Sequence, residues 1–248
     1  MKNFTTSKSS KISVVTDGKK QEADLYSDEG FEMLATLTTK SGVYKRKMYE
    51  LDWLGVKCIQ IPNDIVAMQE IIWSVKPDII VETGVAHGGS LILSASVLEL
   101  IGKGKVVGVD VDIREHNRKT LDAHPLRHRL ELVEGSSIDN HTAEQVKSYI
   151  GPGDIVLVVL DSNHTEAHVS KEIEIYSELV SIGSYIVVHD GSQAYVSDIP
   201  GGKPEWEYDH PLTSIRKFLA ENKNFEIDAK MNRWGATSSP DGYLKRVK

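Results

Sequence analysis

The residues most able to do chemistry in this chain are acidic and imidazole side chains that directly follow aliphatic segments. Asp161 and His164 follow one such segment, and His189 and Asp190 follow the next. Carboxylate and imidazole groups together form a ligand set for a divalent cation such as Mg²⁺ or Mn²⁺. If the two segments are neighbouring strands, the pattern predicts a metal site at Asp161, His189 and Asp190. Capping of the following helix or turn by the aspartates is the alternative.

A glycine-rich stretch at residues 82–90 (ETGVAHGGS) has the composition of a cofactor-binding turn. Glycine lets a ligand approach the backbone closely, and the start of a helix offers free N–H groups. The spacing differs from the Gly-x-Gly-x-x-Gly of dinucleotide enzymes, which favours S-adenosylmethionine, because its sulfonium and amino-acid tail need no pyrophosphate cradle. A tight turn without a ligand is the alternative. The candidate cofactor-binding residues here are Glu82, Gly84, His87, Gly88 and Ser90, with a structural role favoured for His87.

Two further segments would complete the cofactor site. Asp110 ends an aliphatic run about 20 residues beyond the glycine turn, where a carboxylate binds the two hydroxyls of a ribose. Asp112 is more simply interpreted as a solvated side chain. Ser137 lies in a polar stretch after the next aliphatic run and is a candidate for the adenine edge, although a plain turn fits equally well. Asp161 is assigned to both the cofactor and the metal.

These residues need a scaffold that gathers them, and the hydrophobic pattern supplies one. Aliphatic runs alternate with helical patterns, which is typical of a doubly wound, mostly parallel α/β sheet of Rossmann type with helices on both faces. Ligands of such sheets bind beyond the carboxyl ends of the strands. The predicted strands are 78–82, 105–111, 130–133, 155–160 and 184–188, with closing strands at 225–227 and 234–238; the predicted helices are 90–100, 142–150, 165–179 and 211–222.

The chain is divided into three parts. Residues 1–30 are rich in Ser, Thr and Lys and predict a flexible lead-in. An N-terminal helical segment follows at 31–76, with a helix from Ile65 capped by Asn63-Asp64. The Rossmann-like domain spans 77–248 and includes an aromatic segment at about 193–211, which we interpret as a substrate lid; a packed surface loop is the alternative.

Composition narrows the class of protein. A net charge of −7 gives no electrostatic footprint for nucleic acid or anionic membrane. No apolar run approaches the roughly 20 residues of a membrane helix, and the polar start is no secretory signal. The single cysteine, Cys58, excludes an internal disulfide. We therefore expect a cytoplasmic protein, forming a homo-oligomer and acting on a small hydroxylated molecule.

Taken as a set, several motifs resemble the cephalosporin hydroxylase family of class I methyltransferases, which includes rhamnosyl O-methyltransferases. The resemblance extends over residues 53–244. Its motifs are Trp53-Leu54-Gly55-Val56, Pro62-x-Asp64, Glu82-Thr83-Gly84, Gly88-Gly89-Ser90, Gly108-Val109-Asp110-Val111-Asp112, Leu160-Asp161-Ser162-Asn163-His164, His168-Val169 and Pro240-Asp241-Gly242-Tyr243-Leu244.

The resemblance implies S-adenosylmethionine as cofactor and a magnesium-type ion held by Asp161 and Asp190. The family usually carries Glu where this chain has His189, and imidazole is a poorer magnesium ligand, so Mn²⁺, weaker binding or no metal stays open. Catechol-type methyltransferases have a lysine base three residues after the corresponding aspartate; His164 occupies that position here and is the candidate catalytic base.

The function predicted is O-methylation of a small metabolite or glycosyl group in natural-product or surface-polysaccharide biosynthesis. Three alternatives stay open: a nicotinamide oxidoreductase, a metal-dependent oxygenase, and a non-catalytic binding protein on the same fold. The first lacks the dinucleotide glycine spacing. The second lacks a clear His-x-Asp…His triad of iron ligands.

Overall fold

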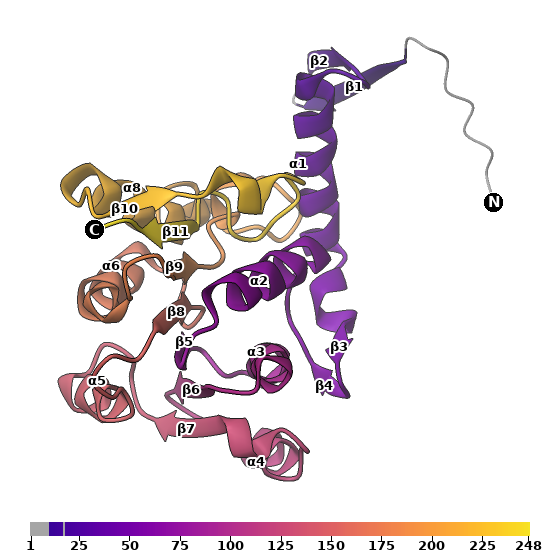
Figure 1. Cartoon of the computed structure of the whole chain (residues 1–248). Coiled ribbons are helices and arrows are strands. Elements are labelled where there is room, and N and C mark those ends of the chain that lie inside the picture. The colour runs from indigo at the N-terminus through magenta and orange to yellow at the C-terminus, as the bar shows by residue number, and fades with distance from the viewer. Residues whose placement is uncertain (1–9, 17) are drawn as a thin grey trace.

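The computed structural model describes residues 10–16 and 18–248 and is built around a seven-stranded sheet (Figure 1). The strand order is β10-β11-β9-β8-β5-β6-β7, with β7, β6, β5, β8 and β9 parallel and β11 antiparallel to both of its neighbours. The strands are β5 (Ile79–Thr83), β6 (Lys105–Asp110), β7 (Leu130–Glu134), β8 (Val156–Leu160), β9 (Tyr185–Val188), β10 (Phe225–Ile227) and β11 (Tyr243–Arg246).

Helices cover both faces of this sheet. In Figure 1, α2, α3 and α4 lie on one side of the strands and α5, α6 and α8 on the other. Their bounds are α2 (Pro62–Val75), α3 (Gly89–Ile101), α4 (Glu115–Asp122), α5 (Asn140–Lys147), α6 (Glu166–Tyr176) and α8 (Pro211–Glu221). Short turns of 3-10 helix lie at η2 (Arg127–Arg129) and η3 (Ser177–Leu179). The expected doubly wound, mostly parallel α/β architecture is confirmed.

The aliphatic strands form because successive side chains point to opposite faces and both faces are buried. Ile80 of β5 packs in the core beneath α2 and α3, whereas its neighbours Ile79 and Val81 pack in the core beneath α5, α6 and α8. All five residues of β5 and of β8 are buried. The reversal of strand order at β5 and β8 places the carboxyl ends of these two strands side by side.

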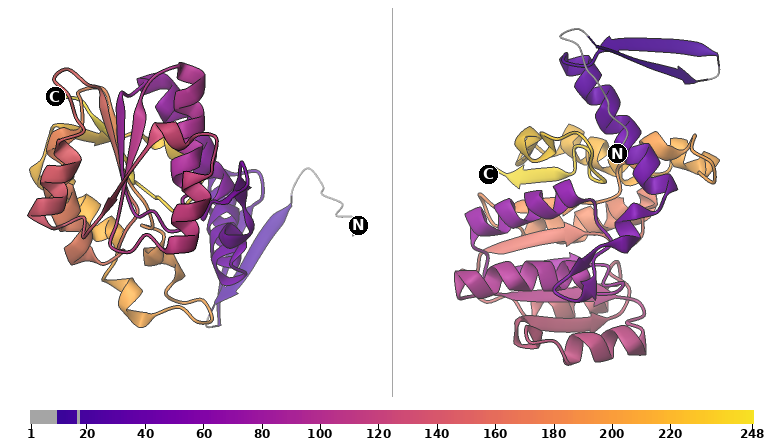
Figure 2. Two further views of the ribbon diagram at one scale, coloured as in Figure 1. Left: turned by 90° about the horizontal axis from the view of Figure 1, so that it is seen from below. Right: turned by 90° about the vertical axis from the view of Figure 1, so that its right-hand side faces the viewer.

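The N-terminal part lies outside this sandwich. Helix α1 (Asp28–Tyr44) projects from it, with an antiparallel hairpin of β1 (Lys11–Thr16) and β2 (Lys19–Asp24) at its far end (Figures 1 and 2). These two strands lie within residues 1–30, where a flexible lead-in without strands was expected; residues 1–9 and 17 lie outside the described residues. Helix α1 continues into η1 (Lys47–Glu50) and the small hairpin of β3 (Asp52–Trp53) and β4 (Val56–Lys57).

Two expected boundaries are wrong, and both involve Asp64. Helix α2 begins at Pro62, not at Ile65, so Asp64 lies inside its first turn instead of capping it. The Asp64 carboxylate is buried and accepts hydrogen bonds from Thr237 Oγ1 at 2.5 Å, the Ser238 amide at 2.8 Å and Tyr243 OH at 2.9 Å. Residues 234–238 therefore form a turn around this carboxylate instead of the expected strand, and the closing strand is β11.

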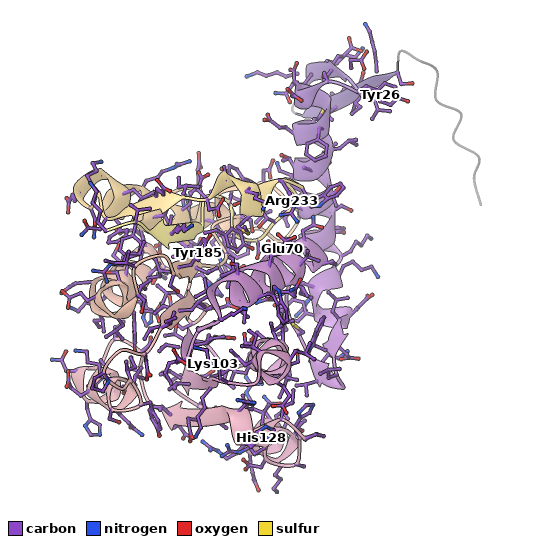
Figure 3. The ribbon with its side chains drawn as sticks, in the orientation of Figure 1. Tyr26, Glu70, Lys103, His128, Tyr185 and Arg233 are labelled. Atoms are coloured by element: carbon purple, nitrogen blue, oxygen red, sulfur yellow. The ribbon has the colours of Figure 1, made fainter. Side chains whose placement is uncertain are left out.

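Other contacts join α2 to the C-terminal part. Glu70 of α2 accepts two hydrogen bonds from Arg233, at 2.9 and 2.7 Å, next to η5 (Ala229–Asn232) (Figure 3). The expected lid region contains α7 (Gln193–Val196) and η4 (Pro204–Glu207). None of the helices in the described ranges is long and apolar enough to cross a membrane.

Candidate active site

The carboxyl ends of β5, β8 and β9 form one platform. The Asp161 amide donates to the Thr83 carbonyl at 2.9 Å, and the His189 amide donates to the Leu160 carbonyl at 3.0 Å, so the ladder continues one residue past each strand. Residues that directly follow these strands are consequently neighbours in space. The structure brings Asp161 and Asp190 together at this edge of the sheet.

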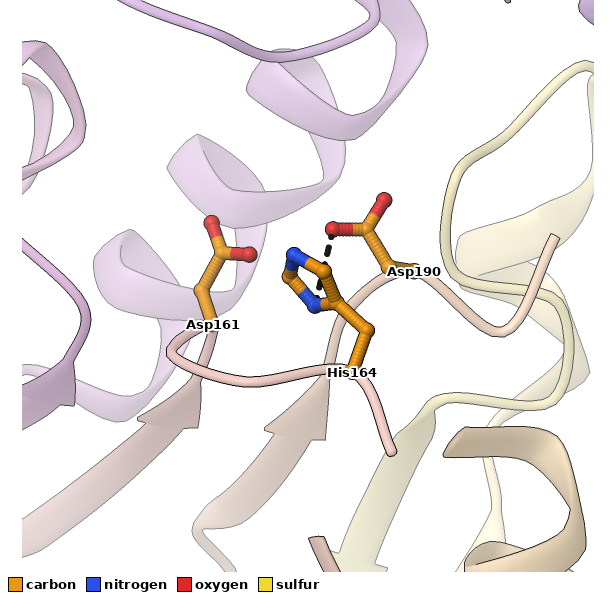
Figure 4. Close-up of side chains that lie close together, drawn as sticks. All are labelled: Asp161, His164 and Asp190. Atoms are coloured by element: carbon orange, nitrogen blue, oxygen red, sulfur yellow. Dashed lines mark ion pairs between the residues drawn. The ribbon is translucent and has the colours of Figure 1, made fainter. Parts of the chain in front are cut away.

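Asp161, His164 and Asp190 each direct one ligand atom into a common space, with these atoms within 4.8 Å of one another (Figure 4). His164 Nδ1 lies 3.3 Å from Asp190 Oδ2. Asp190 has a left-handed backbone with φ of 59°, a conformation that costs free energy for a residue other than glycine and that turns its side chain toward Asp161. Two carboxylates and one imidazole form an oxygen-rich set of donors that fits a Mg²⁺ or Mn²⁺ ion.

The electrostatics of this cluster favour a bound cation. Burial raises the pKa of Asp161 well above its usual range, and the negative charge of nearby Asp190 raises it further. Two carboxylates this close repel one another unless one is protonated or a cation lies between them. A divalent ion would relieve this repulsion, so the residues present fit the expected metal.

The structure does not bring His189 into this group. Its ring is buried, and Nδ1 lies 2.6 Å from Ser239 Oγ. Burial lowers the pKa of His189, so the ring is neutral at pH 7. His164, the candidate base, lies beside the two aspartates, where His189 was expected. His168, four residues on, is turned to a separate cluster, so the two histidines do not share a site.

The glycine turn after β5 passes closely over the start of the Asp161 loop. Gly84 has φ of +92°, and a Cβ at this position would lie 2.0 Å from the Asp161 carbonyl oxygen. Gly88 has φ of +87° and precedes α3 as its N-cap. Residue 84 must therefore be glycine for two reasons: its backbone has a positive φ, and the Asp161 carbonyl leaves no room for a Cβ.

Replacing Gly84 with Ala is expected to lower the free energy of unfolding by about 2–5 kcal/mol, since the new Cβ adds overlap to the strain of a positive φ. Gly153→Ala is the matched control, because Gly153 has φ of +88° but nothing within 4 Å of a Cβ. It should lose only about 1–2 kcal/mol. Chemical denaturation measures both variants, and equal losses would contradict the close contact at Gly84.

The candidate cofactor residues surround this turn. Buried Glu82 accepts a hydrogen bond from Ser90 Oγ, and burial raises the pKa of Glu82 to about 7. Asp110 Oδ2 accepts from the amides of Val85 at 2.8 Å and Ala86 at 3.1 Å. The Asp110 contacts hold the backbone of the turn, and the contact of Glu82 with Ser90 joins the end of β5 to the first turn of α3.

His87 is oriented by a residue of α4, a helix that the sequence analysis did not predict. Its Nδ1 lies 3.2 Å from Asn117 Oδ1, and Asn117 Nδ2 donates to the Ala86 carbonyl at 2.7 Å. Asn117 thus supports the turn from outside, which agrees with the structural role favoured for His87.

Replacing Asp110 with Ala is expected to weaken S-adenosylmethionine binding at least tenfold with the fold retained. The change removes both a carboxylate for the ribose and the support of the turn amides, and bonds to a charged group contribute about 1.5–3 kcal/mol each. Asp112→Ala is the matched control, since Asp112 is exposed. Calorimetric titration measures both dissociation constants, and unchanged affinity in Asp110→Ala would overturn the assignment.

Ser137 lies in a separate buried cluster beside the same strand ends. Its Oγ lies 3.1 Å from His168 Nε2, and its carbonyl accepts from Tyr176 OH at 2.8 Å. Ser162 Oγ donates to the fully buried Glu172 at 2.7 Å and lies 3.2 Å from His168 Nε2. This network fixes the loop that follows β7, where we expect the adenine.

A cavity of about 620 Å³ opens in front of Asp161, His164 and Asp190. This volume is in the range of small-molecule sites. One wall comes from the expected lid, and the other comes from the end of α1, η1 and the segment before α2. Residues of these walls include Gln193, Val196, Ile199, Pro200 and Trp206, facing Tyr44, Arg46, Tyr49 and Gln60.

Sequence reasoning missed the second wall. Its residues precede the glycine turn by more than twenty positions and carry no motif for a ligand. Only the way α1 and η1 pack across the strand ends brings them to the cavity.

Comparison with known proteins agrees with this arrangement. The model of the family described as Rhamnosyl O-methyltransferase/CmcI matches residues 45–247. The chain belongs to this family. Rhamnosyl O-methyltransferase of Mycobacterium tuberculosis (strain H37Rv) is 33% identical over 200 residues, which cover 78% of this chain and 77% of that protein. The Mycobacterium leprae protein of the same name is 28% identical over 187 residues, covering 67% and 77%.

Solved structures show the same fold. The chain superposes on a structure described as "CmcI-N160 apo-structure" with a TM-score of 0.59 at 19% identity, covering 81% of this chain and 77% of that one. The structure "cmcI-D160 Mg-SAM" gives a TM-score of 0.58 at 19% identity, covering 81% and 78%. Together with the strand order, these matches confirm the class I methyltransferase fold that the family resemblance implied.

Proposed function

We propose that this family member is an S-adenosylmethionine-dependent O-methyltransferase that uses a divalent ion and acts on a hydroxyl of a glycosyl group or another small metabolite. The observation that carries the proposal is that Asp161, His164 and Asp190 line the 620 Å³ cavity together with Ala86 of the glycine turn. Relatives named rhamnosyl O-methyltransferase and a fold neighbour described with Mg and SAM support it.

In this proposal, different residues bind the cofactor, hold the ion and accept the proton. Bound at this site, S-adenosylmethionine would supply an activated methyl group and a Mg²⁺-type ion would orient the acceptor oxygen and favour its deprotonation. The glycine turn, Glu82, Ser90 and Asp110 would hold the cofactor. Asp161 and Asp190 would hold the ion, and alignment of acceptor and cofactor supplies several kcal/mol of the rate enhancement. His164, whose Nδ1 faces Asp190, would accept the acceptor's proton with its other ring nitrogen.

The expected lid closes one side of the cavity. We propose that residues 193–211 exclude water from the bound acceptor, because Val196 and Ile199 present apolar side chains and Trp206 an aromatic one to the cavity. Aromatic and apolar surface is suited to the non-polar face of a sugar ring or a similar compact acceptor.

The purified protein tests the function directly. It is incubated with S-adenosylmethionine carrying a labelled methyl group, Mg²⁺ and a panel of glycosides that includes p-nitrophenyl α-L-rhamnoside. The expected result is transfer of label to a glycoside hydroxyl, loss of transfer with a chelator, and recovery with Mg²⁺ or Mn²⁺. Product formation that needs iron and 2-oxoglutarate instead would overturn the proposal in favour of an oxygenase.

We also propose that copies of the chain self-associate through the projecting α1 arm. Large apolar side chains are exposed on and beside it, among them Tyr26, Phe31, Leu34 and Trp234, and exposed apolar groups gathered on one element mark an interaction surface. Light scattering of the purified chain measures its mass, and a monomer at all concentrations would contradict this proposal.

A further inference from the structure

The wall of the cavity contains a buried amide that the proposed chemistry does not use. Gln60 is 5% exposed and lines the cavity together with Asp161, His164 and Asp190. Its backbone is held in place, since the Gln60 amide N–H donates to the Cys58 carbonyl at 3.0 Å and α2 begins two residues later. The position of the side chain at the wall is therefore set by the fold.

A chain of buried polar groups holds the side chain from behind. Gln60 Nε2 lies 3.5 Å from His189 Nε2, and the other ring nitrogen of His189 lies 2.6 Å from Ser239 Oγ. Ser239 Oγ lies 3.4 Å from Ser238 Oγ, which donates to the Asp64 carboxylate at 2.8 Å. Because Asp64 belongs to the first turn of α2, this chain links the amide to the rigid part of the fold.

The amide nevertheless retains most of its hydrogen-bonding capacity. Gln60 Oε1 is buried and has no hydrogen-bond partner among the described residues, 10–16 and 18–248. The contact of Nε2 with His189, at 3.5 Å, is at the long limit of a hydrogen bond. Buried polar atoms are almost always paired, so an unpaired amide at a cavity wall indicates a ligand group that completes it. Exchanging the positions of its oxygen and nitrogen would still leave one polar atom without a partner.

The position of Gln60 determines which part of a ligand it meets. Gln60 lines the same cavity as Asp161, His164 and Asp190 without belonging to their cluster. An acceptor whose reacting hydroxyl lay at that cluster would bring a neighbouring substituent toward Gln60. A neutral amide that can accept one hydrogen bond is matched by a second hydroxyl.

Resting on the proposed function, we propose that Gln60 is a specificity-determining residue that binds a hydroxyl adjacent to the methylated one. The acceptor class is consequently a vicinal diol, such as a sugar ring with two neighbouring free hydroxyls. An acceptor without the second hydroxyl leaves the buried amide unpaired on binding, and sites built to hydrogen-bond a hydroxyl reject analogues that lack it.

The test compares p-nitrophenyl α-L-rhamnoside with its mono-deoxy analogues, by turnover and by calorimetric binding in the presence of S-adenosylhomocysteine and Mg²⁺. Loss of the methylated hydroxyl abolishes product and identifies its position. Loss of the hydroxyl next to it should weaken binding to the parent protein by about tenfold or more. In Gln60→Met, which keeps the side-chain length and removes both polar atoms, this preference should fall to about twofold or less.

Matched variants separate this role from a structural one. Gln145→Leu changes an exposed glutamine on α5 and should keep the full preference of the parent protein. Gln60→Ala is measured beside Gln60→Met, and S-adenosylmethionine affinity and melting temperature are checked for each. If either folded Gln60 variant binds diol and deoxy acceptor with the ratio of the parent protein, Gln60 does not read the second hydroxyl and the inference is overturned.

Binding and turnover keep the two proposals distinguishable. Glycosides that bind with the expected preference but receive no methyl group would contradict the proposed function and support the role of Gln60. Glycosides that are methylated without any preference for the neighbouring hydroxyl would support the proposed function and contradict the role of Gln60. No binding of any glycoside would overturn the diol inference.

Discussion

Replacing Asp161 or Asp190 with Asn is expected to reduce methyl transfer by roughly 10²–10⁴-fold and to abolish its stimulation by Mg²⁺. A neutral amide is a poor ligand for a hard cation, so each change removes half of the carboxylate pair that holds the ion. Asn is chosen because it tolerates the left-handed backbone of residue 190, where φ is 59°. Steady-state rates with and without chelator give the result.

The same changes should not destabilise the metal-free protein, although they reduce its activity. The charge of Asp190 contributes to the raised pKa of Asp161, so removing one charge relieves repulsion in the metal-free protein. The melting temperature of Asp190→Asn without metal should therefore equal or exceed that of the parent, while added Mg²⁺ no longer raises it. Transfer that is indifferent to chelator in the parent protein would show that the two carboxylates have another task.

Replacing His164 with Asn is expected to lower the catalytic rate constant by roughly 10²–10⁴-fold while the affinity for S-adenosylmethionine holds. The side chain keeps its polarity and loses its basicity. Since Nδ1 lies 3.3 Å from Asp190 Oδ2, the other ring nitrogen is the one available to take a proton or to bind the ion. The pH–rate profile distinguishes a base from a ligand.

A base at His164 predicts that the acidic limb of this profile disappears in His164→Asn. A profile that keeps its acidic limb would assign proton transfer to another group. Magnesium titration of the same variant then measures the contribution of His164 as a ligand. His168→Asn is the matched control, because His168 contacts Ser137 and Ser162 instead of the aspartates.

Much of the site could be predicted because its residues follow buried strands. Asp110 ends one aliphatic run and Asp161 directly follows another. The carboxyl ends of parallel strands lie at the same edge of the sheet, so these side chains are predicted to lie near one another. That His164 joins the two aspartates and His189 does not could not be predicted. Side chains of successive residues point in different directions, and His189 Nδ1 is engaged by Ser239, fifty residues along the chain, while Asp190 has a left-handed backbone.

Local hydrophobic periodicity determined the alternating strands and helices, the glycine turn and the order of polar residues along the sheet edge, because each depends on side chains close in sequence. Tertiary structure alone decided the rest. The turn at 234–238 forms around Asp64, some 170 residues away, and Tyr44 and Gln60 reach the cavity only because α1, η1 and the segment before α2 pack across the strand ends. Such contacts form because buried polar groups need hydrogen-bond partners, and those partners lie far away in sequence. No short stretch of the chain therefore predicts them.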